Sequence, residues 1–323
     1  MGTASVCYTL TTGGGKTTIF SYIVDGAAAR GRLLLAHRIE LVEQISAALD
    51  RGGVAHGLIA PDAPETANAV QVASVATLAR RLDRWRDRFD LVIIDECHHS
   101  IASSWRKIIE SQPRAKILGV TATRGRLDGR GLGEIFDALI EGPTIAELIA
   151  DRWLVPAVVF SPAAAPDLSG GKIKMGDYDV AELRDAMGGG IVESAVAEYL
   201  RICPGARVIL FAVDIRHGRD VVGAFVAAGV KAAHVDGEAP AAERRALAAF
   251  ARGEIKVLSN VALFGEGFDL PALDGVIMLR PTQSLALYLQ QVGRALRPAP
   301  GKDRALILDF AGNATSRSAR CAA

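Results

Sequence analysis

Short apolar runs alternate with amphipathic, helix-like stretches along most of this 323-residue chain. Because parallel strands are buried on both faces and joined by crossover helices, such alternation is typical of βαβ units. The pattern therefore predicts two α/β domains of similar size, each built on a parallel sheet. The predicted strands are Val6–Leu10, Arg32–Ala36, Val70–Ser74, Leu91–Ile94 and Lys116–Val120 in the first half, and Val208–Ala212, Ala232–Val235, Lys256–Ser259, Val276–Leu279 and Ala305–Leu308 in the second.

Two helices between these strands carry recognisable start signals. Pro240 suits the first turn of a helix, which predicts a helix over Ala241–Arg252. Thr282 or Ser284 suits the N-cap of another helix, over Leu285–Ala295.

The charge balance gives the chain no strong overall field. Lysine and arginine total 37 and aspartate and glutamate total 36, so the formal net charge is +1. Aromatic residues make up 6%, which argues against a surface that binds bases mainly by stacking. Any nucleic-acid site must therefore be local.

No stretch predicts a membrane span or a secretory signal. Charges or glycines interrupt each apolar stretch before the roughly 18–20 residues that cross a bilayer. Met1–Leu10 has neither a basic region nor a cleavage site. The four cysteines lack the spacing of disulfide pairs, which predicts reduced thiols and a cytoplasmic protein. They are Cys7, Cys97, Cys203 and Cys321.

A glycine-rich segment, Leu10–Thr17, lies between the first predicted strand and a helix that begins near Lys16. Glycines let successive backbone N–H groups converge, the helix N-terminus adds a positive dipole end, and Lys16 adds a charge. The Thr17 hydroxyl can ligate Mg²⁺. The alternative is a surface turn and an ordinary lysine; the flanking strand and helix favour a P-loop, although Leu10 stands where glycine is expected. The predicted phosphate-binding residues are Gly13, Gly14, Gly15, Lys16, Thr17 and Thr18.

Two carboxylates follow the apolar strand 89–94, at the sheet edge where α/β proteins bind ligands. We expect Asp95, with Thr17, to hold Mg²⁺ and Glu96 to orient and deprotonate an attacking water. The alternative is an acidic strand exit without chemistry. For the Cys97–His99 segment we expect no zinc, because no second Cys or His pair lies at ligand spacing. His98 is instead interpreted as a hydrogen-bonding relay beside the nucleotide.

The P-loop and Asp95-Glu96-Cys97-His98 together resemble motifs I and II of the superfamily-2 helicases, in the DExH branch. Later segments resemble further motifs of that family in the same order, from Thr9 to about Asp309. These segments are Leu35–Leu41 (motif Ia), Ser74–Leu78 (the next strand-contacting loop), Thr121–Thr123 (motif III), Val208–Val213 (motif IV), Ser259–Asp269 (motif V) and Gln290–Arg297, which fits the QxxGRxxR of motif VI.

The resemblance implies two RecA-like domains, with ATP and Mg²⁺ in the cleft between them and a nucleic-acid strand across both. It places an ATP-binding domain at 1–156, a partly mobile connection at 157–190 and a helicase C-terminal domain at 191–323. It also implies that Gly267 and Asp269 contribute to the nucleotide site.

The last motif makes chemical sense by itself. Arg294 and Arg297 lie about one turn apart on a predicted helix and can present two guanidinium groups to the γ-phosphate, with Gln290 on the same face. If they come from the second domain, hydrolysis requires closure of the domains. The alternative is a solvated basic helix end.

Nucleic-acid contacts are predicted at His37, Arg38, Thr77 and Asn260, through the sugar-phosphate backbone. Ordinary loop residues and caps are the alternative for each of them. The arginine-rich stretch 80–88 contains interleaved aspartates, which favours a solvated helix over a DNA patch.

The leading hypothesis is an ATP-dependent DNA helicase or translocase. The choice of DNA rather than RNA as the substrate depends on the resemblance to phage, repair and restriction-type motors. An RNA helicase is the alternative. A second hypothesis is a nucleic-acid-binding subunit or fragment without productive ATPase activity. It is considered because the family's upstream adenine-recognition element has no room before the P-loop. A protein partner would supply the missing N-terminal or C-terminal elements. A metabolic P-loop kinase is a third, and it leaves the second half without a role.

Overall fold

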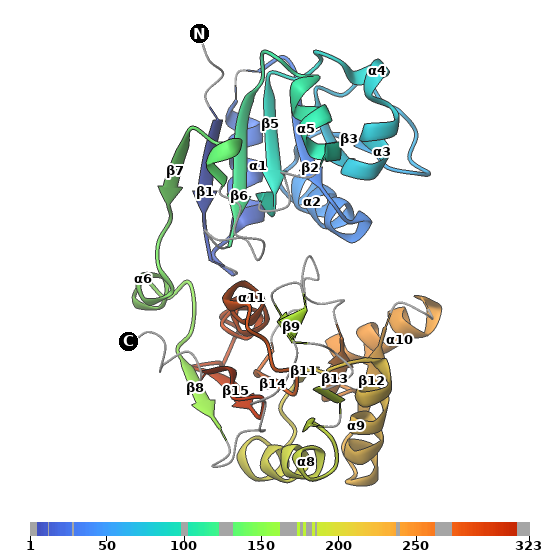
Figure 1. Ribbon diagram of the computed structural model, residues 1–323, viewed down its shortest axis with the longest axis vertical. Coiled ribbons are helices and arrows are strands. Elements are labelled where there is room, and N and C mark those ends of the chain that lie inside the picture. The colour runs from blue at the N-terminus through green and yellow to red at the C-terminus, as the bar shows by residue number, and fades with distance from the viewer. Residues whose placement is uncertain are drawn as a thin grey trace. The chain divides into compact units, whose positions relative to one another are not determined.

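Parallel sheets form in both halves of the chain (Figure 1). The computed structural model describes residues 5–11, 13–27, 29–97, 103–122, 132–161, 173–174, 177–178, 183–184, 186–236, 240–261 and 273–314. Within these ranges the chain divides between Ile145 and Ala146 into a first unit and a second unit.

In the first unit, the described strands form one parallel sheet in the order β3-β4-β2-β5-β6-β1-β7. The strands are β1 (Ser5–Thr9), β2 (Arg32–Ala36), β3 (Gly57–Ile59), β4 (Val70–Ser74), β5 (Leu91–Asp95), β6 (Lys116–Thr121) and β7 (Ala138–Glu141). The helices are α1 (Lys16–Gly26), α2 (Ile39–Arg51), α3 (Val75–Arg80), α4 (Leu82–Trp85), α5 (Ser103–Glu110) and the short 3₁₀ helix η2 (Leu132–Glu134).

Strand alternation divides the apolar side chains of this sheet between two cores. Leu33 and Leu35 of β2 face a core with Trp85 and Trp105, on the side of α3, α4 and α5. Leu34 lies in the other core, which contains residues of α1 and α2. Successive side chains of a strand point to opposite faces, so a nearly continuous apolar run fills both cores.

The second unit contains a parallel sheet in the order β12-β13-β11-β14-β15-β8. Its strands are β8 (Ala157–Phe160), β11 (Val208–Phe211), β12 (Ala232–Val235), β13 (Val257–Asn260), β14 (Gly275–Met278) and β15 (Ala305–Asp309). Its helices are α8 (Gly190–Ile202), α9 (Ile215–Ala227), α10 (Pro240–Ala251) and α11 (Leu285–Ala295), and α6 (Ile145–Ala150) begins at the division. A separate antiparallel pair joins β9 (Ile173–Lys174) and β10 (Asp177–Tyr178).

The predicted fold class, two α/β parallel-sheet domains, is confirmed. All ten predicted strands are present, and their bounds agree to within one residue. The predicted helices correspond to α10 and to α11, where the Ser284 hydroxyl accepts a hydrogen bond from the Leu287 N–H at 3.2 Å.

The first residues of the connection predicted at 157–190 form a strand instead. Ala157–Phe160 form β8, which pairs in parallel with β15 and so belongs to the second sheet. This edge strand is half exposed although all four of its residues are apolar, and its short run opens a Pro- and Gly-containing stretch that favours a connection. Most of residues 161–189 lie outside the described residues.

We find no helix among the described residues that is long and apolar enough to cross a membrane.

Candidate functional site

The loop between β1 and α1 depends on glycine at three consecutive positions. Gly13 and Gly15 both have φ of 87°, a conformation that side chains disfavour. Gly14 lacks space instead: a Cβ there would lie 2.9 Å from the Leu10 side chain. Leu10 is buried beneath the loop, and its N–H donates to the Thr121 carbonyl at 2.9 Å. The leucine found at an expected glycine position thus supports the loop from below.

The N-terminus of α1 has the features of an anion site. Gly15 is the N-cap and provides no side-chain hydrogen bond, and the first turn contains no acidic residue. The first bond within the helix runs from the Ile19 N–H to the Gly15 carbonyl, at 3.1 Å. The N–H groups of the preceding turn therefore have no carbonyl partner within the helix, and they add to the positive end of its dipole.

Lys16 forms an ion pair with Glu96, and the Lys16 Nζ donates to Glu96 Oε1. The two side chains are 13% and 9% exposed, so water screens the pair little. Burial by itself lowers the pKa of Lys16, but the negative charges of Glu96 and Asp95 outweigh it and leave the pKa above its ordinary value. Lys16 therefore remains a cation at the mouth of the glycine loop.

Glu96 reaches this position through an unusual backbone conformation directly after β5. Its φ is 47°, which is uncommon for a residue with a side chain and costs about 1–3 kcal/mol. The Glu96 N–H donates to Asp95 Oδ1 at 3.0 Å. The turn places two successive carboxylates at the end of one strand, with one of them paired to the lysine.

Two thiols meet just behind this turn. The Sγ atoms of Cys7 in β1 and Cys97 are 3.6 Å apart, as a hydrogen-bonded pair in which either thiol can donate. Gly119 of β6 makes room, because a Cβ there would lie 2.8 Å from the Cys97 Cβ and 2.3 Å from the Phe136 ring. The hydrogen bond with Cys7 and burial raise the pKa of Cys97 well above its usual value. Spacing along the sequence gave no signal for this pair.

The residues predicted to contact nucleic acid in the first unit follow two other strands of the same sheet. His37 and Arg38 come directly after β2, and Arg38 is exposed at the N-cap of α2. Thr77 is buried in α3, where its N–H and hydroxyl both bond to Ser74, the N-cap. An S-x-x-T pattern is the signal that could have identified Ser74 as the cap. The sheet order places β4 and β2 on one side of β5, with β6 and β1 on the other.

In the second unit, Asn260 is buried at the end of β13 and its side-chain amide donates to the Leu210 carbonyl at 3.4 Å. Gln290 and Arg294 are both buried on α11, and Arg297 follows the helix end, half-buried. Positions 290 and 294 are about one turn apart, so Gln290 and Arg294 share one face of α11. The structure therefore brings Gln290 and Arg294 to one helix face, and Arg297 lies two residues beyond the last residue of the helix.

Several predicted residues lie outside what the structure describes. These are His98, Gly267 and Asp269, together with the side chain of Thr17. Among the described residues, no group of three or more His, Cys, Asp or Glu side chains is arranged to hold a metal ion.

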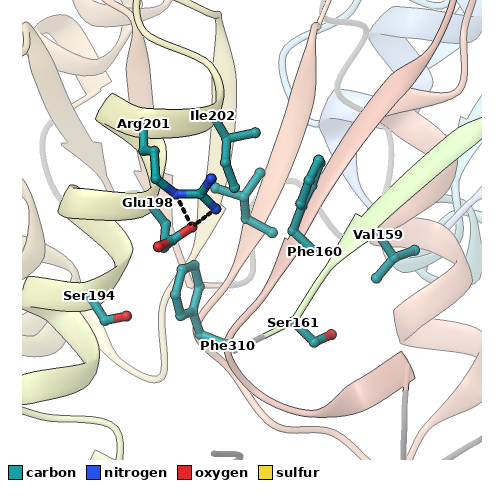
Figure 2. A pocket seen from close by; sticks show the side chains of 9 residues that line it. Val159, Phe160, Ser161, Ser194, Glu198, Arg201, Ile202 and Phe310 are labelled. Atoms are coloured by element: carbon teal, nitrogen blue, oxygen red, sulfur yellow. Dashed lines mark hydrogen bonds and ion pairs between the residues drawn. The ribbon is translucent and has the colours of Figure 1, made fainter. Parts of the chain in front are cut away.

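A separate pocket of about 470 Å³ opens in the second unit between α8 and the strands β8 and β15 (Figure 2). Arg201 pairs with Glu198 at its wall, where the Arg201 Nε donates at 3.1 Å. No predicted site residue is among those that line it: Val159, Phe160, Ser161, Ser194, Glu198, Arg201, Ile202, Leu308 and Phe310.

The glycine loop, its buried lysine and the two strand-end carboxylates define a P-loop α/β protein with a second, arginine-bearing α/β unit. Residues 2–126 match the family described as "Type III restriction enzyme, res subunit", and residues 192–299 match "Helicase conserved C-terminal domain". The chain belongs to superfamily 2 of the helicases.

Relatives resemble the chain over nearly its whole length. A 51.5 kDa protein of a Lactococcus phage is 37% identical over 92% of this chain and 63% of its own. A Saccharomyces cerevisiae protein with the provisional name ATP-dependent helicase IRC3 is 32% identical over 96% of this chain and 49% of its own. This chain thus spans between about half and two thirds of these relatives.

A solved structure has the same fold. It is a fragment assigned to the HsdR subunit of a type I restriction enzyme from Vibrio vulnificus, 23% identical, with a TM-score of 0.74. The match covers 97% of this chain and 61% of that one.

Proposed function

We propose that the chain is an ATP-dependent motor that moves on nucleic acid, on DNA in preference to RNA, and uses Mg²⁺. The observation that carries the proposal is the buried Lys16–Glu96 ion pair beside the glycine loop. The pair supports the proposal because it joins a cation that would bind phosphate oxygens and a carboxylate that would orient water.

The residues of this site fit a bound magnesium nucleotide. The amides of the first turn of α1 and Lys16 would hold the β- and γ-phosphates, and Asp95 with Thr17 would hold the metal. The bound Mg²⁺ supplies charge neutralisation on the phosphate oxygens. When Lys16 turns to the phosphates, the Glu96 carboxylate is released from its ion pair and is then available to orient and deprotonate a water.

The second unit contributes the remaining charge in this proposal. Arg294 and Arg297 stabilise the charge that develops on the γ-phosphate, Gln290 contacts the phosphates or the water, and His98 relays hydrogen bonds. Gly267 and Asp269 complete the nucleotide site, as the family resemblance implies.

The nucleic-acid track is proposed along the ends of β2, β4 and β13. His37 and Arg38, directly after β2, would contact phosphates from the first unit. Thr77 is buried and bonded to Ser74, and Asn260 is buried and bonded to the Leu210 carbonyl. We therefore propose that these two residues shape the nucleic-acid-binding surface in addition to contacting the nucleic acid. The match to a restriction-enzyme family supports DNA as the track.

The proposal includes a protein partner and a cytoplasmic location. A subunit of a larger enzyme is among the structures with this fold, which supports a partner. Cys7, Cys97 and Cys203 are buried free thiols, which fits a reducing compartment.

The test is steady-state ATP hydrolysis by the chain, without polymer and with single-stranded or duplex DNA or RNA, beside Glu96→Gln. We expect DNA to raise the rate more than RNA does, and Glu96→Gln to abolish the rise while still binding a fluorescent ATP analogue. Retained DNA binding with no turnover on any polymer would instead identify a nucleic-acid-binding subunit. A rate indifferent to all polymers would favour a kinase-like P-loop enzyme.

A further inference from the structure

The C-terminal end of α11, the helix that carries Gln290 and Arg294, is anchored by hydrogen bonds from the Lys302 side chain and the Val155 backbone. Three consecutive carbonyls at this end accept hydrogen bonds. The Ala295 and Arg297 carbonyls accept from the Lys302 ammonium, the latter at 2.9 Å, and the Leu296 carbonyl accepts from the Val155 N–H at 2.8 Å. Such carbonyls have no partner within a helix, so a buried helix end needs donors from elsewhere.

Lys302 also bonds outside the helix. Its Nζ donates to the carbonyl of Leu273, which precedes β14. An ammonium has three N–H donors, so these three carbonyls use all of them. In sequence, Leu273 follows the segment that contains the predicted Gly267 and Asp269. One side chain thus ties the end of the arginine helix to the start of a central strand.

The opposite end of α11 is tied down as well. The Ser284 hydroxyl caps the helix, and the Thr282 hydroxyl accepts from the Ser284 N–H at 3.0 Å. Asn313 closes this arrangement, because its side chain accepts from the Thr282 N–H at 2.9 Å and donates to the Arg280 carbonyl at 3.1 Å. Both ends of α11 are therefore fixed to other parts of the second unit.

We propose that Lys302 is a positioning residue for Arg294 and Arg297, which fixes the C-terminal end of α11 so that both guanidinium groups are held ready for the γ-phosphate. The inference rests on the proposed function, since it assumes that these arginines act on ATP. Arg297 lies beyond the last helical turn, and its own carbonyl is a ligand of the ammonium. Without Lys302, the Arg297 carbonyl loses the hydrogen bond that fixes the orientation of the Arg297 backbone.

The lowered pKa of Lys302 predicts a pH dependence of activity that an ordinary exposed lysine would not produce. Burial lowers the pKa of Lys302 to about 8, although the nearby Asp274 carboxylate acts in the opposite direction. Asp274 is the charged side chain that acts on the ammonium, and it also accepts a hydrogen bond from the Arg207 N–H at 2.7 Å. Below pH 8 the ammonium serves three carbonyls; above it, a neutral amine has only two N–H groups and leaves one carbonyl without its donor.

The experiment compares Lys302→Met and Lys302→Arg with the parent chain in DNA-stimulated ATP hydrolysis between pH 6.5 and 9.5. We expect Lys302→Met to lower kcat at pH 7 roughly 10- to 100-fold, the size of effect that small misplacements produce, with KM for ATP changed less than about twofold. In the parent, kcat should fall above pH 8. Lys302→Arg should keep its kcat at pH 9, because a guanidinium stays charged.

The matched control is Lys231→Met, which removes an exposed lysine of the same unit and should leave kcat and its pH profile unchanged. A Lys302→Met protein with parental kcat at pH 7, or a Lys302→Arg protein that loses activity above pH 8 as the parent does, would overturn the proposal.

Hydrogen exchange on the same proteins separates this proposal from the proposed function. We expect the amides of residues 290–297 to exchange at least tenfold faster in Lys302→Met than in the parent, with α8 unchanged. Equal exchange rates at 290–297 would refute the role of Lys302 whatever the ATPase assay shows. If the parent hydrolyses no ATP, the proposed function fails, and the exchange rates still decide whether Lys302 fixes the helix.

Discussion

The two units position their candidate catalytic groups by different means. In the first unit the backbone does this: positive φ angles at Gly13, Gly15 and Glu96 aim amides and a carboxylate at one point. In the second unit, side chains hold the ends of α11, the helix that carries the candidate residues Gln290 and Arg294. A site built by backbone turns is sensitive to a single added methyl group. A site held by side chains is sensitive to the loss of a cap and to pH.

The largest expected effect is at the backbone-built site. Lys16→Ala should lower the rate of ATP hydrolysis about 100- to 1000-fold, because it removes the preorganised cation for the phosphates. Steady-state hydrolysis with saturating DNA measures it. Lys107→Ala, at an exposed lysine of α5, is the control and should hydrolyse ATP normally. A Lys16→Ala protein as fast as the parent would contradict both the site and the proposed function.

Adding one methyl group behind the carboxylate turn should be the next largest effect. Gly119→Ala should lower the free energy of unfolding by about 1–3 kcal/mol, because the new Cβ would overlap the Phe136 ring and Cys97. Urea denaturation measures it. Gly133→Ala meets no atom within 4 Å and should change stability by less than about 0.5 kcal/mol. Equal stabilities of the two variants would show that Phe136 and Cys97 leave room for a Cβ at position 119.

Loss of the cap on α11 should have a smaller effect. Ser284→Ala should lower the free energy of unfolding by about 1 kcal/mol, since the Leu287 N–H loses its acceptor. Ser194→Ala, within α8, is the control and should change it by less than about 0.5 kcal/mol. If denaturation curves of the two variants coincide, the cap contributes nothing to holding the helix.

The smallest expected effect is a pH dependence in the second unit. Burial lowers the pKa of His217 below 6.5, while its Nδ1 accepts from the Val213 N–H at 3.2 Å. The unfolded chain therefore takes up this proton first as the pH falls, so stability is complete above pH 6.5 and decreases below it, by at most about 1.4 kcal/mol per pH unit for one proton. Urea denaturation at pH 7.5 and 5.5 measures this slope. His217→Gln should flatten it; an unchanged slope would assign the dependence to other groups.

The sequence was sufficient for the central strands because these are buried on both faces and read as apolar runs. It was insufficient for three edge strands, β3, β7 and β8, although a fourth edge strand, β12, was predicted. The P-loop could be predicted because its glycines and lysine are consecutive. The pair Cys7 and Cys97 could not, because it depends on the sheet order that places β6 between β1 and β5.

The same distinction applies to the helix of the second unit. Its Ser284 cap is a local signal next to the helix start, and the sequence predicts either Ser284 or Thr282 as the cap. Lys302 lies beyond the helix end, and its three carbonyl partners come from two separate segments. Only the tertiary fold brings these groups together, so no local pattern could have identified it.

The pairing of β8 with β15 has a consequence for synthesis on the ribosome. These two strands are the first and last of their sheet along the chain, yet they are neighbours within it. The ribosome makes β15 about 150 residues after β8, which at roughly 5–20 residues per second is a delay on the order of ten seconds. Until then the nascent chain carries β8 without the neighbour it has in the finished sheet, and slow codons between the two strands would prolong its exposure to aggregation.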